Sequence, residues 1–220
     1  MRRIATPEPL YLLLADASCA ARYRPDLLDA ADAARIAAAP RLAGRADWQV
    51  SRFLKQQAGL PVLSLSHSKG AALLAAGWQA ENIGVDIEWL QARDFAALSA
   101  LWCRRSEQQW LAVRGWRAAD YYRLWCVKEA LIKAAGLDFP AALADVGLMM
   151  RAGSHVCLHV HGHAGWHGVA GLNGGWASAC VWPAHKNVQI EWRRFGAFRR
   201  PEQAWRDVWT CVSDAAVMPV

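Results

Sequence analysis

The sequence predicts an α+β fold, in which segments with helical character and segments with strand character follow one another twice along 220 residues. Three observations predict it: stretches rich in Ala, Arg and Gln come before stretches of alternating apolar and polar residues, Gly and Pro separate the stretches, and the order repeats. We therefore expect two similar α/β halves, 1–95 and 96–220, each a small, mainly antiparallel sheet packed against helices.

The N-terminal half should contain two helices and several strands. Between Asp29 and Gln57, with a break at Pro40, we expect one short helix and a longer one at 45–57, which Gly59 and Pro61 end. From 62 to 68 the leucines and His67 alternate with serines, as in a strand that exposes a different set of side chains on each face. The strands of this half are expected at 10–15, 62–68, 71–78 and 83–89.

The C-terminal half repeats this order in a looser form. A helical stretch begins at Ser106, and a stronger helix should run from Tyr121 to Ala135, with Gly136 ending it. Strands divided by Gly or Pro turns are expected at 146–150, 155–160, 167–172, 176–182 and 188–195.

Composition excludes several classes of protein. The chain is 55% hydrophobic and 20% charged, as in ordinary globular proteins. Its net charge of +6 favours an acidic partner, but the basic residues are spread along the chain, which argues against nucleic acid. The six cysteines lack metal-ligand spacing, and no apolar run is long enough to span a membrane. Because acidic residues and prolines interrupt the apolar run after Arg2-Arg3, we expect a first strand in a cytoplasmic protein.

The segment Gly84-Val85-Asp86-Ile87-Glu88 carries two carboxylates. In a strand, Asp86 and Glu88 share one face about 7 Å apart, a spacing that can bracket one cation. Gly84 would let a ligand approach the backbone beside them. For this segment alone, an amphipathic strand with a solvated acidic face is the favoured interpretation.

The segment from Trp125 to Lys133 carries a second acidic residue in a predicted helix. Glu129 and Lys133 are four residues apart and so share one helix face. They could form a surface pair that contributes a few tenths of a kcal/mol. Alternatively, Glu129 binds a metal and Lys133 neutralises phosphate oxygens.

Ser66-His67-Ser68 invites comparison with serine hydrolases, but adjacent residues of a strand point to opposite faces, and the chain has no GxSxG segment. Considered alone, His67 is more often a core or hairpin histidine than a ligand.

In this order and spacing, the Ser-His strand, the Asp-x-Glu strand and the Trp-x-x-Lys-Glu-Ala-x-x-Lys helix resemble the 4′-phosphopantetheinyl transferases, specifically the larger monomeric type with two halves related by a pseudo-twofold axis. The resemblance spans 61–136. It implies transfer of the 4′-phosphopantetheine arm of coenzyme A to a serine of an apo acyl or peptidyl carrier protein, giving the holo carrier and adenosine 3′,5′-bisphosphate. Such carriers serve fatty-acid, polyketide and nonribosomal-peptide synthesis.

The resemblance also implies roles for individual residues. Asp86, Glu88 and Glu129 would bind Mg²⁺, with Mn²⁺ as an alternative, and Lys133 and His67 would bind the pyrophosphate of coenzyme A, with Ser66 beside them. Glu129 and Lys133 would thereby take part in catalysis.

Glu107 resembles the acidic residue that the family places between its metal motifs, and it is a candidate general base. A helix-capping role for the Ser106-Glu107 segment is equally consistent with the sequence.

Arg45 and Arg52 are the candidates for the adenine and 3′-phosphate end of coenzyme A, although a solvated arginine face explains them equally well. The chain departs from the family's pattern at Gly59-Leu60-Pro61, where a lysine is common in place of Leu60.

Two alternatives from other classes remain at this stage. One is a non-catalytic module that binds coenzyme A or carrier proteins, which would tolerate loss of the carboxylates. The other is a magnesium-dependent nucleotide hydrolase, although the chain has no P-loop.

Overall fold

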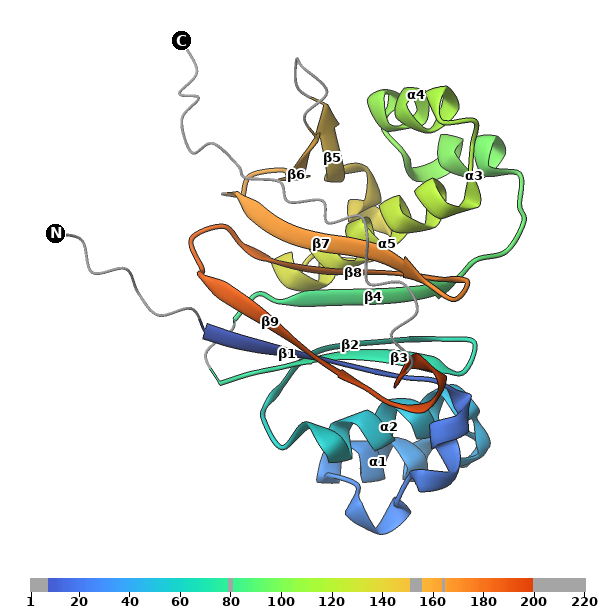
Figure 1. The fold of residues 1–220 in the computed structure, drawn as a ribbon, viewed down its shortest axis with the longest axis vertical. Helices are drawn as coiled ribbons and strands as arrows, with labels where there is room; N and C mark the ends of the chain where they lie inside the picture. Colours follow the sequence, from blue (N-terminus) through green and yellow to red (C-terminus); the bar gives the residue numbers. More distant parts are fainter. Residues whose placement is uncertain (1–7, 79–80, 151–155, 164, 200–220) are drawn as a thin grey trace, which may run out of the picture.

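The computed structural model describes residues 8–78, 81–150, 156–163 and 165–199. Two sheets pack face to face, and helices cover the outer face of each (Figure 1). The α+β class predicted from the sequence is confirmed, with small, mainly antiparallel sheets packed against helices.

The first sheet has the strand order β2-β3-β1-β9. Its strands are β1 (Glu8–Ala15), β2 (Val62–Ser68), β3 (Ala71–Ala76) and β9 (Val188–Arg194). Neighbouring strands are antiparallel except β1 and β9, which are parallel. Helices α1 (Ala30–Ala38) and α2 (Ala46–Ala58) lie below this sheet in Figure 1. Gly59, with φ of 62°, ends α2 in the left-handed region that favours glycine.

The second sheet has the order β4-β8-β7 and is antiparallel throughout. Its strands are β4 (Gly84–Trp89), β7 (Trp166–Asn173) and β8 (Trp176–Pro183). Helix α5 (Ala118–Ala135) packs on its outer face. Beyond it lie α3 (Phe95–Trp102), α4 (Arg105–Val113) and a hairpin of β5 (Val146–Met150) and β6 (Val156–Val160) (Figure 1). Short 3₁₀ helices complete the described chain at Ala17–Arg22, Pro25–Leu27, Pro40–Gly44, Ala141–Ala144 and Gly196–Arg199.

Strand periodicity accounts for the layers. In β1, Leu10, Leu12 and Leu14 pack into the core between the two sheets, whereas Leu13 packs against α2. Val85 and Ile87 of β4 enter the same inter-sheet core from the other side. Because both faces of each sheet are covered, the central strands are apolar on both faces.

The two sheets exchange strands across position 95. Strand β4 lies before that position but pairs with β8, and β9 comes from the end of the described chain but pairs with β1. The predicted halves, 1–95 and 96–220, therefore each contribute one strand to the other's sheet. This exchange carries the carboxylates of β4 against the helix of the C-terminal half.

Most elements lie close to their predicted positions. Strands β2 and β5 have the predicted bounds, and α5 begins three residues before the predicted Tyr121, at Ala118. Position 155 of the strand predicted at 155–160 lies outside the described residues. Within the described ranges, no helix is both long and apolar enough to cross a membrane.

Candidate active site

Three carboxylates meet where β4 and α5 pack together. Oxygen atoms of Asp86, Glu88 and Glu129 all lie within 4.8 Å of one another. A Cβ atom at Gly84 would lie 1.8 Å from the Ala130 carbonyl oxygen, so only glycine lets α5 approach β4 this closely. The space beside Gly84, expected from the sequence to admit a ligand, is therefore filled by the helix that carries Glu129.

Asp86 is buried rather than solvated. Its residue is 1% exposed, and its Oδ1 atom accepts hydrogen bonds from Ser66 Oγ at 2.7 Å and from Lys133 Nζ at 2.8 Å. The other carboxylate oxygen, Oδ2, is buried without a hydrogen-bond partner among the residues that the structure describes. The solvated acidic face considered from the sequence is thus wrong for Asp86, because α5 and β2 cover that side of β4.

Burial and neighbouring charge raise the pKa values of Glu88 and Glu129. Burial, followed by the charge of Asp86, raises the pKa of Glu129 to about 7, against the lowering effect of Lys133. Burial also raises the pKa of Glu88, although the Ser68 hydroxyl opposes this rise. Because oxygen ligands of this kind suit hard divalent cations, the donor set fits Mg²⁺, and the unpartnered Asp86 oxygen supports that fit.

Lys133 is the cation nearest this cluster among the described residues. Its Nζ atom donates to Asp86 and to the Val85 carbonyl oxygen at 3.1 Å, and lies 3.7 Å from Glu129 Oε2. Burial by itself would lower the pKa of Lys133, but the Asp86 and Glu129 carboxylates outweigh burial and raise it. One ammonium thus faces three carboxylates, which leaves the cluster negative.

The serine face of β2 contacts β4. Ser66 Oγ donates to Asp86, and Ser68 Oγ donates to Glu88 Oε2 at 2.7 Å. Ser64 Oγ accepts a hydrogen bond from the Val85 amide at 3.0 Å. The contact between Ser68 and Glu88 was missed from the sequence. The matching period of two in Ser66-x-Ser68 and Asp86-x-Glu88 was the available signal.

His67 points away from these serines. Its Nδ1 atom lies 3.5 Å from Asp47 Oδ2, and Asp47 is held by Arg45 through two hydrogen bonds of 3.1 and 2.6 Å. Burial lowers the pKa of His67, Asp47 opposes this, and the charges of Arg45 and Arg52 lower it further. Arg45 and Arg52 therefore both lie close enough to His67 for their charges to lower its pKa.

The two arginines occupy different environments. The Arg45 side chain is 59% exposed, whereas Arg52 is buried, bonded to Asp32 at 2.6 Å and stacked 3.7 Å above the ring of Trp48. The solvated arginine face considered from the sequence is wrong for Arg52, because its side chain turns between α1 and α2.

Glu107 is not brought to the carboxylate cluster. It is 0% exposed, and its oxygens accept hydrogen bonds from Lys128 Nζ at 2.8 Å and from the amides of Leu148 and Arg104, both at 2.9 Å. The Arg104 contact caps the start of α4, with Arg104 in the N-cap position that the sequence gave to Ser106. In this structure Glu107 joins α4, α5 and β5.

Comparison with known proteins identifies a family over part of the chain. Residues 82–181 match the model of the 4′-phosphopantetheinyl transferase superfamily. A solved structure of Helicobacter pylori holo-[acyl-carrier-protein] synthase in complex with coenzyme A is 14% identical, covers 46% of this chain and 97% of its own, and superposes with a TM-score of 0.35. No curated protein matches the chain.

Proposed function

The chain belongs to the 4′-phosphopantetheinyl transferase superfamily, and from that premise we propose that it transfers the 4′-phosphopantetheine arm of coenzyme A to a serine of an apo acyl or peptidyl carrier protein. The products are the holo carrier and adenosine 3′,5′-bisphosphate. The family match covers the strand that carries Asp86 and Glu88 and the helix that carries Glu129.

One observation carries the proposal. Three carboxylates from β4 and α5 converge within 4.8 Å, with one buried carboxylate oxygen unpartnered and a single lysine beside them. Asp86, Glu88 and Glu129 would hold Mg²⁺, or Mn²⁺ in its place. A divalent cation bound there supplies positive charge to the pyrophosphate of coenzyme A.

The chain's own residues would position the reactants. In the reaction, the serine hydroxyl gives up its proton to solvent and its oxygen bonds to the phosphorus that carries the pantetheine arm. The bond from that phosphorus to the bridging pyrophosphate oxygen breaks, and adenosine 3′,5′-bisphosphate leaves. Lys133 would hold the pyrophosphate oxygens on the side of the carboxylate cluster, and His67 would hold them on the side of Arg45, so that charge on the departing bisphosphate is met by fixed donors. Ser66, which holds Asp86 at 2.7 Å, keeps that carboxylate in place.

Arg45 is the stronger candidate for the 3′-phosphate end of coenzyme A. It is exposed, and among the described residues its side chain bonds to the neighbouring carboxylate of Asp47. Arg52, enclosed by Asp32 and Trp48, would contribute its charge rather than a direct contact. Glu107 takes a structural role in this proposal, because all of its bonds are internal.

The carrier is expected to be acidic, because the chain has a net charge of +6. The two predicted halves occur in one chain, so we propose that a monomer forms a complete site, in a cytoplasmic setting where coenzyme A and apo carriers meet.

The test is to incubate the purified protein with coenzyme A, Mg²⁺ and a panel of apo acyl and peptidyl carriers, and to weigh each carrier by mass spectrometry. We expect the mass of one phosphopantetheine group to be added, and no addition with EDTA or with a carrier whose acceptor serine is alanine. Unchanged masses across the panel would rule out the transferase, and calorimetric binding of coenzyme A without transfer would indicate a non-catalytic module.

A further inference from the structure

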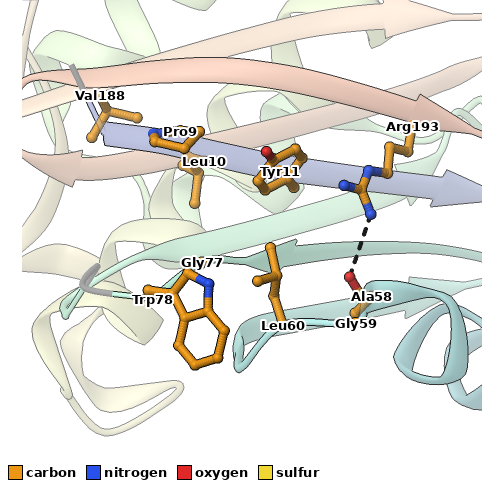
Figure 2. A pocket seen from close by; sticks show the side chains of 10 residues that line it. All are labelled: Pro9, Leu10, Tyr11, Ala58, Gly59, Leu60, Gly77, Trp78, Val188 and Arg193. Atoms are coloured by element: carbon orange, nitrogen blue, oxygen red, sulfur yellow. Dashed lines mark hydrogen bonds between the residues drawn. The ribbon is translucent and has the colours of Figure 1, made fainter. Parts of the chain in front are cut away.

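A cavity lies at the edge of the first sheet, between the end of α2 and the start of β1. Its volume is about 450 Å³, which is within the usual range for small-molecule sites. Tyr11, Leu60 and Trp78 contribute apolar surface, and Arg193 reaches over from β9 (Figure 2). None of the residues that line it belongs to the carboxylate cluster or was predicted to bind coenzyme A.

The cavity lies apart from the carboxylate cluster. Tyr11 and Leu60 pack with the core on the α2 side of the first sheet, and Leu10, which also lines the cavity, packs with the core between the sheets. The cluster instead lies where β4 of the second sheet packs against α5. A ligand that contacts the described lining residues would therefore not contact the carboxylates of the proposed active site.

Two aromatic side chains line the cavity. Trp78 is 76% exposed although it is a large apolar residue, and in Figure 2 its ring lies beside Leu60, across from Tyr11. Exposed single apolar residues are common, but here the exposed ring borders a hollow that has a second aromatic wall. Such walls suit a flat aromatic ligand, because rings pack favourably in stacked or edge-to-face arrangements.

Among the described residues that line the cavity, Arg193 is the only charged one. Its guanidinium lies 4.3 Å from the centre of the Tyr11 ring, and Nη1 makes a long contact of 3.4 Å with the Ala58 carbonyl oxygen (Figure 2). Among the described residues, its Nε and Nη2 atoms donate to no protein acceptor. These two donors are parallel, an arrangement that carboxylates match with two hydrogen bonds.

We propose that this cavity binds a small aromatic carboxylate, with the ring between Tyr11 and Trp78 and the carboxylate on Arg193. The proposal is independent of the transferase reaction, because none of the described residues that line the cavity belongs to the carboxylate cluster.

The experiment is isothermal titration calorimetry of the full chain with 2-naphthoate, uncharged 2-naphthylmethanol and decanoate as probes. We expect saturable binding of 2-naphthoate, with the alcohol and decanoate each at least about tenfold weaker, the ratio that roughly 1.4 kcal/mol produces. Decanoate binding as tightly as 2-naphthoate would overturn the aromatic assignment, and absence of saturable 2-naphthoate binding would overturn the site.

Substitutions in and beside the cavity test whether 2-naphthoate binds there. Arg193→Gln should weaken 2-naphthoate about tenfold and abolish its advantage over the alcohol, whereas Arg194→Gln, the matched control beside it in β9, should leave both unchanged. Leu60→Trp, which fills the cavity and keeps the charge, should abolish binding of both probes. If Leu60→Trp or Arg193→Gln binds 2-naphthoate as tightly as the unaltered chain, or if coenzyme A competes with it, the separate site is wrong. A thermal melt of each variant checks that it is folded.

Discussion

Helix α5 carries two acid–lysine contacts that differ in charge balance. On one face, Lys128 and Glu107 form a pair in which both side chains are 0% exposed, and Lys128 also donates to the Val146 carbonyl oxygen at 2.7 Å. On the other, Lys133 alone faces Asp86, Glu88 and Glu129. The first contact has one charge of each sign, and the second has three carboxylates for one ammonium.

The difference in charge balance indicates that the Lys128–Glu107 pair stabilises the fold, whereas the cluster around Asp86 is suited to binding a ligand. A buried pair with matched charges and complete hydrogen bonds needs nothing from outside the chain. The cluster around Asp86 keeps a buried oxygen without a partner among the described residues, and its charges help to raise the pKa of Glu129 to about 7, so its donor set suits a bound cation. Lys128 and Glu129 are adjacent in sequence, yet Lys128 belongs to the buried pair and Glu129 belongs to the carboxylate cluster.

Removing the Asp86 carboxylate from the cluster should have the largest effect on the rate of transfer. Asp86→Asn should lower the rate of transfer by at least about 1000-fold, the scale lost with a central electrostatic group. The fold should persist, because the asparagine oxygen can still accept from Ser66 and Lys133. Carrier mass against time measures the rate, and circular dichroism checks the fold. A rate within tenfold of the unaltered chain would show that Asp86 is not a metal ligand.

Breaking the balanced pair should cost stability instead. Lys128→Met leaves Glu107 buried without its cation, and should lower the free energy of unfolding by about 3–5 kcal/mol. Denaturant titration measures this. Glu107→Gln combined with Lys128→Met should recover part of the loss, because no uncompensated charge remains. A single variant that loses less than about 1 kcal/mol would contradict the structural role.

Local sequence periodicity predicted much of the fold. The alternation in 62–68 and 84–88 placed β2 and β4, and a glycine marks the end of both α2 and α5. What periodicity could not predict is which strands pair over long distances. The exchange of β4 and β9 between sheets depends on the inter-sheet core, to which residues far apart in sequence contribute.

The same limit applies to the candidate site. The sequence grouped Asp86, Glu88 and Glu129 only through resemblance to a family, since each motif alone also fits a solvated surface. It could not reveal that Arg52 is enclosed by Asp32 or Glu107 by Lys128, because both pairs join elements 20 or more residues apart. Burial of a charged residue is decided by its distant partner, which local sequence does not specify.

Neutralising Glu129 should reduce the repulsion among the three carboxylates. The pKa of Glu129 in the folded chain, about 7, lies above its ordinary value of 4.5, so the stability of the metal-free protein should fall as pH rises between these values. Glu129→Gln should remove this fall and stabilise the metal-free chain at pH 8 by roughly 1–3 kcal/mol, the scale of such a shift. Added Mg²⁺ should stabilise only the unaltered chain. Thermal melts with and without Mg²⁺ measure both effects, and a Gln variant that is less stable at pH 8 would refute the repulsion.

The smallest effect concerns the hydroxyls that hold the carboxylates. Ser68→Ala removes the hydrogen bond that Glu88 accepts at 2.7 Å, and should weaken Mg²⁺ about tenfold, as is typical for partners that orient metal ligands. Ser66→Ala should weaken it less, because Asp86 keeps its bond to Lys133. Ser178→Ala is the matched control: its hydroxyl is also buried but has no hydrogen-bond partner within the described part of the chain, so Mg²⁺ affinity should not change. Calorimetric titration with Mg²⁺ measures all three, and equal affinities for the Ser68 and Ser178 variants would mean that Glu88 does not depend on β2 for its position.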